Sequence, residues 1–380
     1  NGQVIGLMHS NGQTTAIDAN YASQLKVSGL SSLDAALRET SIRTSLPDTE
    51  QEAMTMMTLK KGQLKMQDYD KYADEFIEKF PTSAFGYKEK AFDLVNDSKY
   101  EEAARMMETG IKKSAAKDEA HSNYSDIIYQ KIIYKGDSVY TAWTLDKALD
   151  EARQAYAIKA QPVYKHQEAR ILFTKGDYAD AANIFLDLTK TPINSGELYL
   201  EAAQAKTRLK APDSEIEMLL DSAVSVGART NMAGPYYLAR AQYLADKGQY
   251  RRAVQDYNMY DSIARPVDPA FFYARYQCET KLRMGQPALF DIARTCYLAP
   301  KEPTFFAEWA SLDLRVKRYD EGISAASRCI ELAPEYADGY LLLGLLYKEK
   351  NMKAEAIKNL KKAEELGDKR AAGYLEKIKK

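Results

Sequence analysis

The chain is poor in the side chains on which most metal sites and disulfide frameworks depend. Among 380 residues there are three cysteines, an odd number, and no Cys-x-x-Cys pair. This excludes a disulfide framework and a cysteine zinc site. The three histidines, His9, His121 and His166, are widely separated in the sequence. Helices stacked in sequence order would not bring them together, so we expect no metal and no cofactor.

Motifs of the common enzyme classes are absent as well. The sequence contains no G-x-x-x-x-G-K-[ST] or G-x-G-x-x-G phosphate loop, no H-E-x-x-H and no G-x-S-x-G. Its carboxylates occur in mixed runs with lysines, which is typical of solvated helix faces. We therefore predict no catalytic residues and a protein that is not an enzyme.

Net charge and long apolar runs are also lacking. Lys and Arg number 53 against 54 Asp and Glu, and such a balance provides little drive for binding nucleic acid. The longest apolar run, 340–347, is interrupted by Gly344 and is far shorter than the roughly 20 residues of a membrane span. The chain begins Asn1-Gly2 without a leader, which favours a removed export signal, and so a periplasmic, envelope or secreted location over the cytoplasm.

What the sequence does contain is a repeated turn. A tight polar turn, a Tyr and a small residue three positions later occur at 175–181, 247–253 and 316–322. A second series of small residues precedes these turns, with spacings of 34 between Ala169 and Ala203 and between Ala310 and Gly344. Antiparallel helices approach closely only where both carry small side chains. One such pair cannot bury both of its faces, so pairs stack.

These residues resemble the tetratricopeptide repeat (TPR) family, whose unit is a 34-residue helix–turn–helix. The resemblance covers residues 50–380 and is strongest in 162–195 and 303–367. It implies an all-α fold, an α-α superhelix, that is, a right-handed solenoid of antiparallel helix pairs. We expect a flexible N-terminal tail and then one solenoid of about eight to nine pairs. The expected segments are the tail at 1–14, the solenoid at 15–380 with a degenerate first pair at 15–48, a long unit at 118–161 and a capping helix at 369–380.

Two units depart from the pattern. The unit at 268–302 carries Arg275 and Tyr276 where small residues belong, which predicts looser or shifted packing. The long unit contains Tyr134, Tyr140 and Trp143, which either form an exposed aromatic patch or fill an enlarged gap between helices. Gap filling is the simpler interpretation.

One cysteine pair has a symmetric position in the repeat. Cys278 and Cys296 are equidistant from Pro287, so a hairpin would hold them at the same height. In an oxidising compartment these two cysteines could form a disulfide, although two buried thiols are the commoner outcome.

In the TPR family the first helix of each pair lines a concave groove. One residue beyond the small positions stand Arg170, Gln204, Gln242, Gln277 and Ser311. Amides and a guanidinium at repeat spacing suit hydrogen bonding to an extended peptide. The alternative is that an exposed groove simply carries polar residues. The resemblance implies these candidate groove residues: His166, Arg170, Gln204, Arg208, Gln242 and Gln277.

Three functions are compatible with these features. The first is a non-catalytic module that holds a protein or peptide partner as an adaptor or assembly factor. The second is a carbohydrate-active enzyme built from helix hairpins, or a polysaccharide-associated envelope protein. The short repeat unit and the lack of a carboxylate pair in any motif argue against this second function. The third is a self-associating scaffold, that is, a homo-oligomer.

Overall fold

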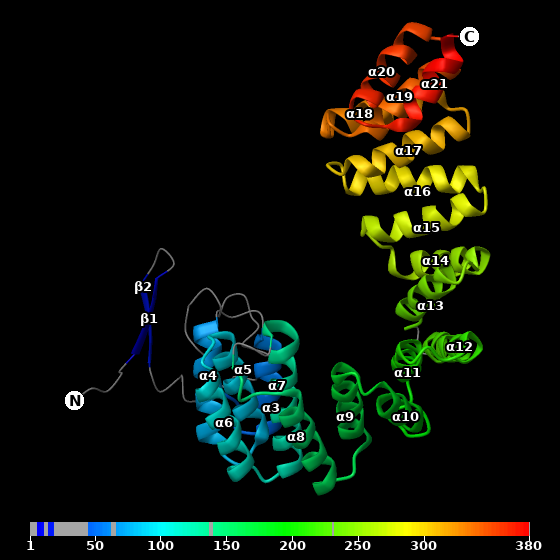
Figure 1. Cartoon of the computed structure of the whole chain (residues 1–380). Coiled ribbons are helices and arrows are strands. Elements are labelled where there is room, and N and C mark those ends of the chain that lie inside the picture. Colours follow the sequence, from blue (N-terminus) through cyan, green and yellow to red (C-terminus); the bar gives the residue numbers. More distant parts are fainter. Residues whose placement is uncertain are drawn as a thin grey trace. The chain divides into compact units, whose positions relative to one another are not determined.

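The structure is a computed structural model that describes residues 6–10, 14–18, 45–61, 66–136, 140–229 and 232–379 (Figure 1). The chain divides into two compact units, Asn1–Ile184 and Phe185–Lys380, here called unit 1 and unit 2. Within the described ranges, no helix combines the length and the apolar character that a bilayer crossing requires.

The first described elements are two strands. β1 (Gly6–Ser10) pairs antiparallel with β2 (Thr14–Asp18), with Gly6 opposite Asp18 and Ser10 opposite Thr14. The strand at 14–18 differs from the helix pair predicted to begin at residue 15, whereas the flexibility of the tail over 1–14 stays a prediction. An Asn-Gly dipeptide at 11–12 is the sequence signal for a hairpin. Residues 19–44 of the expected helix pair lie outside the described residues.

The described residues of unit 1 form three successive helix pairs followed by α9. Helix starts are set locally: the Thr49 side chain accepts a hydrogen bond from the Glu52 N–H, and Pro162 opens α9. The pair α7/α8 occupies the expected long unit, and α7 alone has 19 residues. The helices are α3 (Glu50–Lys60), α4 (Met66–Lys79), α5 (Ala84–Asn96), α6 (Tyr100–Lys113), α7 (Lys117–Lys135), α8 (Leu145–Ile158) and α9 (Pro162–Lys175).

Unit 2 consists of five successive helix pairs and a final helix. The boundary between the units falls within α10 (Tyr178–Leu188). The helices that follow are α11 (Gly196–Arg208), α12 (Asp213–Arg229), α13 (Gly234–Asp246), α14 (Tyr250–Ala264), α15 (Pro269–Lys281), α16 (Gly285–Leu298), α17 (Pro303–Arg315), α18 (Tyr319–Leu332), α19 (Ala337–Glu349), α20 (Lys353–Glu365) and α21 (Lys369–Lys379).

The repeated turn has one backbone design. The second residue after the first helix is left-handed in successive pairs, with φ of 74° at Gly248, 57° at Arg283 and 64° at Lys317. The next N–H then bonds back to a carbonyl five residues earlier, as from Gln249 to Leu244 at 2.8 Å. This closes the helix end in the manner of a Schellman cap. The polar turns in the sequence therefore mark the reversal between the two helices.

Small residues lie where the helices of a pair meet, as the periodicity predicts. Ala241 and Ala253 are fully buried in the α13/α14 pair, and so are Ala310 and Ala326 in α17/α18. At Gly344 an added Cβ would lie 2.7 Å from Leu360 Cγ. Apart from the hairpin, the described chain is helical and consists of antiparallel pairs, which confirms the all-α repeat fold. A single solenoid over 15–380 stays a prediction.

The pair α15/α16 departs from small-residue packing in an unexpected way. Arg275 is 6% exposed, and its Nε and Nη2 donate to the two carboxylate oxygens of Asp291 at 2.7 and 2.8 Å. Its Nη1 donates to Asp261 at 2.9 Å and to Asn258 at 3.0 Å. Looser packing of this pair is therefore not what the structure shows, because a buried bidentate ion pair joins the two helices.

Candidate functional site

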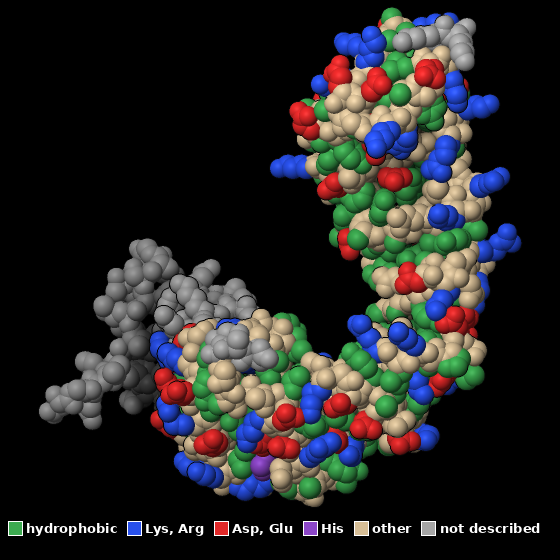
Figure 2. Space-filling model, in the orientation of Figure 1, with side chains coloured by type: hydrophobic (Ala, Val, Ile, Leu, Met, Phe, Trp, Pro, Cys, Tyr) green, Lys and Arg blue, Asp and Glu red, His purple; other side chains and the backbone are tan. Residues whose placement is uncertain are grey.

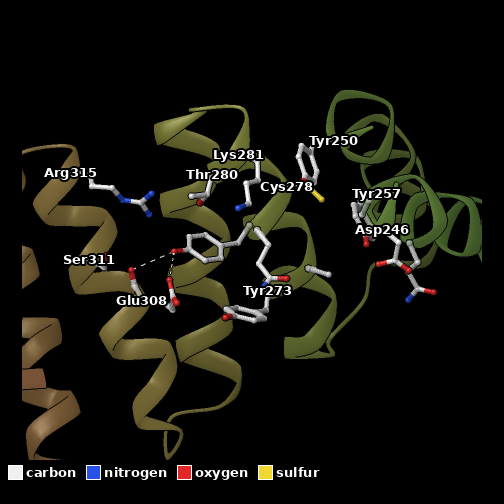
Figure 3. Close-up of a pocket in the computed structure, with 15 residues that line it drawn as sticks. Asp246, Tyr250, Tyr257, Tyr273, Cys278, Thr280, Lys281, Glu308, Ser311 and Arg315 are labelled. Carbon is white, nitrogen blue, oxygen red and sulfur yellow. Dashed lines mark hydrogen bonds between the residues drawn. The ribbon is translucent and has the colours of Figure 1, made fainter. Parts of the chain in front are cut away.

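A groove of about 840 Å³ lies within unit 2, lined mainly by α13, α15 and α17 (Figure 3). We call it the α13–α17 groove. These are the first helices of three successive pairs, so each contributes the same face. The groove residues used below are Gln242, Asp246, Tyr257, Tyr273, Tyr276, Gln277, Cys278, Lys281, Glu308, Ser311 and Arg315.

Three members of the predicted polar row meet in this groove. Gln242, Gln277 and Ser311 follow one another at spacings of 35 and 34 residues, one on each first helix. Both glutamine side chains are exposed and Ser311 is half-buried. A side-chain amide offers a donor and an acceptor together, and these are the two groups that an extended backbone presents.

The other predicted residues do not line the groove. Gln204 and Arg208 are exposed on α11, elsewhere in unit 2. His166 and Arg170 lie on α9 in unit 1, where the Arg170 guanidinium is 5.6 Å from the centre of the Tyr129 ring. The predicted row is thus divided between the two units.

A second row in the groove is missing from the sequence prediction. Asp246, Lys281 and Arg315 are the last residues of α13, α15 and α17, and their spacings are 35 and 34. All three are exposed, and none forms an ion pair with a described residue. The sequence does contain a signal for this second row, because each of its residues stands four positions after a member of the polar row.

Tyrosines form the buried side of the groove. Tyr276 is 2% exposed, and its hydroxyl donates to Glu308 Oε2 at 2.9 Å. Tyr273 stacks on Tyr276 with ring centres 5.7 Å apart. Burial, and next the charge of Glu308, raise the pKa of Tyr276 well above its usual range. Burial likewise raises the pKa of Tyr257. Both phenols therefore remain protonated hydrogen-bond donors at neutral pH.

The cysteines are buried free thiols. Cys278 and Cys296 lie on α15 and α16 and are each 2% exposed, and no disulfide joins them in this structure. Burial raises the pKa of Cys278 to about 11 and that of Cys296 to about 12. Neither thiol is activated as a nucleophile, since reactivity follows the thiolate.

The three aromatic residues of the long unit do not form one exposed patch. Trp143 is 1% exposed, and its Nε1 donates to the Tyr124 hydroxyl at 3.2 Å. Tyr140 is half-buried and meets the Trp143 ring edge-on, with centres 5.5 Å apart. Only Tyr134, at 82% exposure, faces solvent. The extra length of this unit is therefore filled by Trp143 and Tyr140.

Comparison with known proteins supports the fold. No protein-family model and no curated protein matches the chain. Among solved structures, the C-terminal part of a TPR repeat-containing protein from Cytophaga hutchinsonii matches with a TM-score of 0.50 at 15% identity, over 66% of this chain and 98% of that one. The repeating helix pairs of this chain thus have a TPR-type helical-repeat fold.

Two further TPR structures match over smaller parts of the chain. YrrB, a TPR protein with an unusual peptide-binding site, has a TM-score of 0.45 at 18% identity, over 52% of this chain and 99% of that one. MamA from Desulfovibrio magneticus RS-1 has a TM-score of 0.39 at 20% identity, over 45% of this chain and 94% of that one. Both of these TM-scores lie below 0.5, so only the Cytophaga hutchinsonii structure bears on the fold of this chain.

Proposed function

We propose that the chain is a non-catalytic protein-interaction module whose α13–α17 groove binds an extended segment of a partner protein. The observation that carries this proposal is the convergence of Gln242, Gln277 and Ser311 in one groove. The first helices of three successive pairs each present a side-chain amide or hydroxyl at repeat spacing. Such spacing suits a ligand that runs across the helices and repeats its own donors and acceptors, as an extended backbone does.

The surroundings of this row support a peptide. Tyr273 is half-buried, stacks on the buried Tyr276 ring, and supplies aromatic surface of the kind that anchors protein interfaces. Tyr276 is held by Glu308, so part of the groove is rigid before any ligand arrives. Preorganisation of this kind lowers the entropic cost of binding.

The direct test is a random twelve-residue peptide library displayed on phage and selected against the whole chain. Enriched peptides are then measured by fluorescence polarisation against the variant Tyr273→Ala/Gln277→Ala. Loss of aromatic contact and of two hydrogen bonds should weaken binding at least about tenfold. The matched control is Gln204→Ala/Arg208→Ala, which removes exposed side chains outside the groove. Equal affinity of the two variants would refute the groove as the binding site.

A self-associating scaffold is a second candidate because α16 exposes two large side chains. Phe290 is 66% exposed and Tyr297 is 74% exposed. Sedimentation velocity over a range of concentrations tests this function. A dimer that is lost in Phe290→Ser/Tyr297→Ser supports it, and a monomer at every concentration removes it.

A further inference from the structure

Resting on the proposed function, we infer that the α13–α17 groove selects segments with an acidic side chain, which Lys281 and Arg315 hold between them. The partner is thus a protein with a negatively charged extended segment. Asp246 at the α13 side of the same row sets the direction in which that segment lies.

The first ground is that Lys281 and Arg315 form no ion pair within the described part of the chain, whereas nearby cations do. Arg275 is bound to Asp291, Arg240 to Asp256 and Asp221, and Lys247 to Asp213. Lys281 and Arg315 form no ion pair with a described residue. Their charges are available to a ligand.

The second ground is their placement. Lys281 and Arg315 end neighbouring first helices, and both line the groove. In Figure 3 the two side chains extend toward the same space beside Thr280. A carboxylate entering that space meets positive charge from two helices. Lys offers a compact ammonium and Arg a planar fork that matches a carboxylate, so the two together suit one acidic side chain.

The third ground is the pair of acids that border the site. Glu308 lines the same groove, but its Oε2 accepts from the Tyr276 hydroxyl, and it forms no ion pair with Arg315. Asp246, on α13, is exposed and also lacks an ion-pair partner among the described residues. An acidic side chain is therefore favoured at the ends of α15 and α17, where Lys281 and Arg315 lie, and repelled at the end of α13, where a basic side chain fits.

The same two acids argue against a nucleic acid as the ligand. A polyanion crossing the groove would meet Asp246 and Glu308 as well as the two cations. The chain as a whole carries a formal charge of −1. Acidic and basic side chains are interspersed over the face shown in Figure 2. The local pattern, two cations with Asp246 on α13 and Glu308 on α17 beside them, matches a segment of mixed charge that includes at least one Asp or Glu.

The test uses peptides from the same phage selection, in which the displayed segment has no free C-terminal carboxylate. We expect enriched peptides to contain Asp or Glu, and Glu→Gln in the peptide to weaken binding to the whole chain about tenfold, since two exposed ion pairs are lost. The variant Lys281→Glu/Arg315→Glu should weaken binding of the acidic peptide at least as much. The same variant should bind a Glu→Lys peptide more tightly than the wild-type chain does.

The matched control is Lys358→Glu/Lys361→Glu, which makes the same change in net charge on exposed residues of α20. Circular dichroism confirms that both variants fold. Peptides that depend on Tyr273 and Gln277 but show no acidic preference, and that respond equally to both charge variants, would overturn this inference and leave the proposed function standing. Peptides that respond to none of the groove variants would overturn both.

Discussion

The Arg275 guanidinium and the Asp291 carboxylate face each other across the α15/α16 pair. Asp291 is 1% exposed, and both of its carboxylate oxygens accept from the Arg275 guanidinium. The same contact occurs 35 residues earlier between Arg240 and Asp256, with two donor–acceptor distances of 2.7 Å. Two successive helix pairs are thus joined by ion pairs of one geometry.

Breaking the Arg275–Asp291 pair should be costly. Asp291→Asn leaves the buried guanidinium with only the more exposed Asp261 as counter-charge, and we expect a loss of about 3–5 kcal/mol in the free energy of unfolding. Urea unfolding followed by circular dichroism measures it. Arg275→Met/Asp291→Leu should recover most of that loss, because no charge then remains buried. Arg328→Met, at an exposed pair with Glu331, is the control and should cost about 1 kcal/mol or less. A small effect of Asp291→Asn alone would refute the buried pair.

Glu279 should make unit 2 less stable as the pH rises. Burial raises the pKa of Glu279 to about 8, the charge of Asp291 adds to this, and Arg275 opposes it. The folded state therefore keeps a proton that the unfolded state releases near pH 4.5, so stability falls between pH 4.5 and about 8. Glu279→Gln should flatten that fall, by an amount on the order of a few kcal/mol. Urea midpoints measured from pH 5 to pH 9 test this, and parallel profiles would contradict it.

Gly344 and Gly373 should respond in opposite ways to alanine. At Gly344 the new Cβ would lie 2.7 Å from Leu360 Cγ, so Gly344→Ala should be destabilising by about 1–3 kcal/mol. At Gly373, within α21, a new Cβ meets nothing within 4 Å. Gly373→Ala should therefore stabilise by up to about 1 kcal/mol through helix propensity alone. Thermal unfolding measures the change in Tm of each variant. Equal changes in Tm would contradict the close approach of the helices at Gly344.

Substitutions at Trp143 and Tyr134 in unit 1 should differ strongly in their effect on stability. Trp143→Ala empties a buried site, and we expect a loss of about 3–5 kcal/mol. Tyr134→Ser changes an exposed side chain and should stay within about 0.5 kcal/mol. Urea denaturation followed by circular dichroism compares the two variants. A large loss at Tyr134 would mean that this ring is packed against the protein after all.

The fold could be predicted from sequence because its determinants are local and repeated. The polar turns predict where each pair reverses, since Gly248 and its counterparts must adopt a left-handed backbone there. Ala241 and Ala310 predict the close approach because only small side chains allow it. The β1/β2 hairpin was missed because its alternation is short, although the Asn-Gly signal stands between the strands.

The candidate site was only half predictable. Gln242 and Gln277 follow from repeat spacing, and they do line one groove. Asp246, Lys281 and Arg315 have the same spacing, but an exposed charged residue at a helix end looks in sequence like any solvated surface residue. Whether such a charge is already paired depends on which carboxylates neighbouring helices bring near it.

The sequence by itself determined the helical class, the repeat register and the face of each first helix, because these depend on spacing within about 34 residues. The tertiary structure decided which charges are compensated. In the sequence Arg275 departs from the repeat pattern, yet Asp291 and Asp261 from two other helices hold it. Lys281, six residues later on the same helix, forms no ion pair with any residue that the structure describes. Ion pairing requires contact between residues distant in sequence, and only the folded chain establishes that contact.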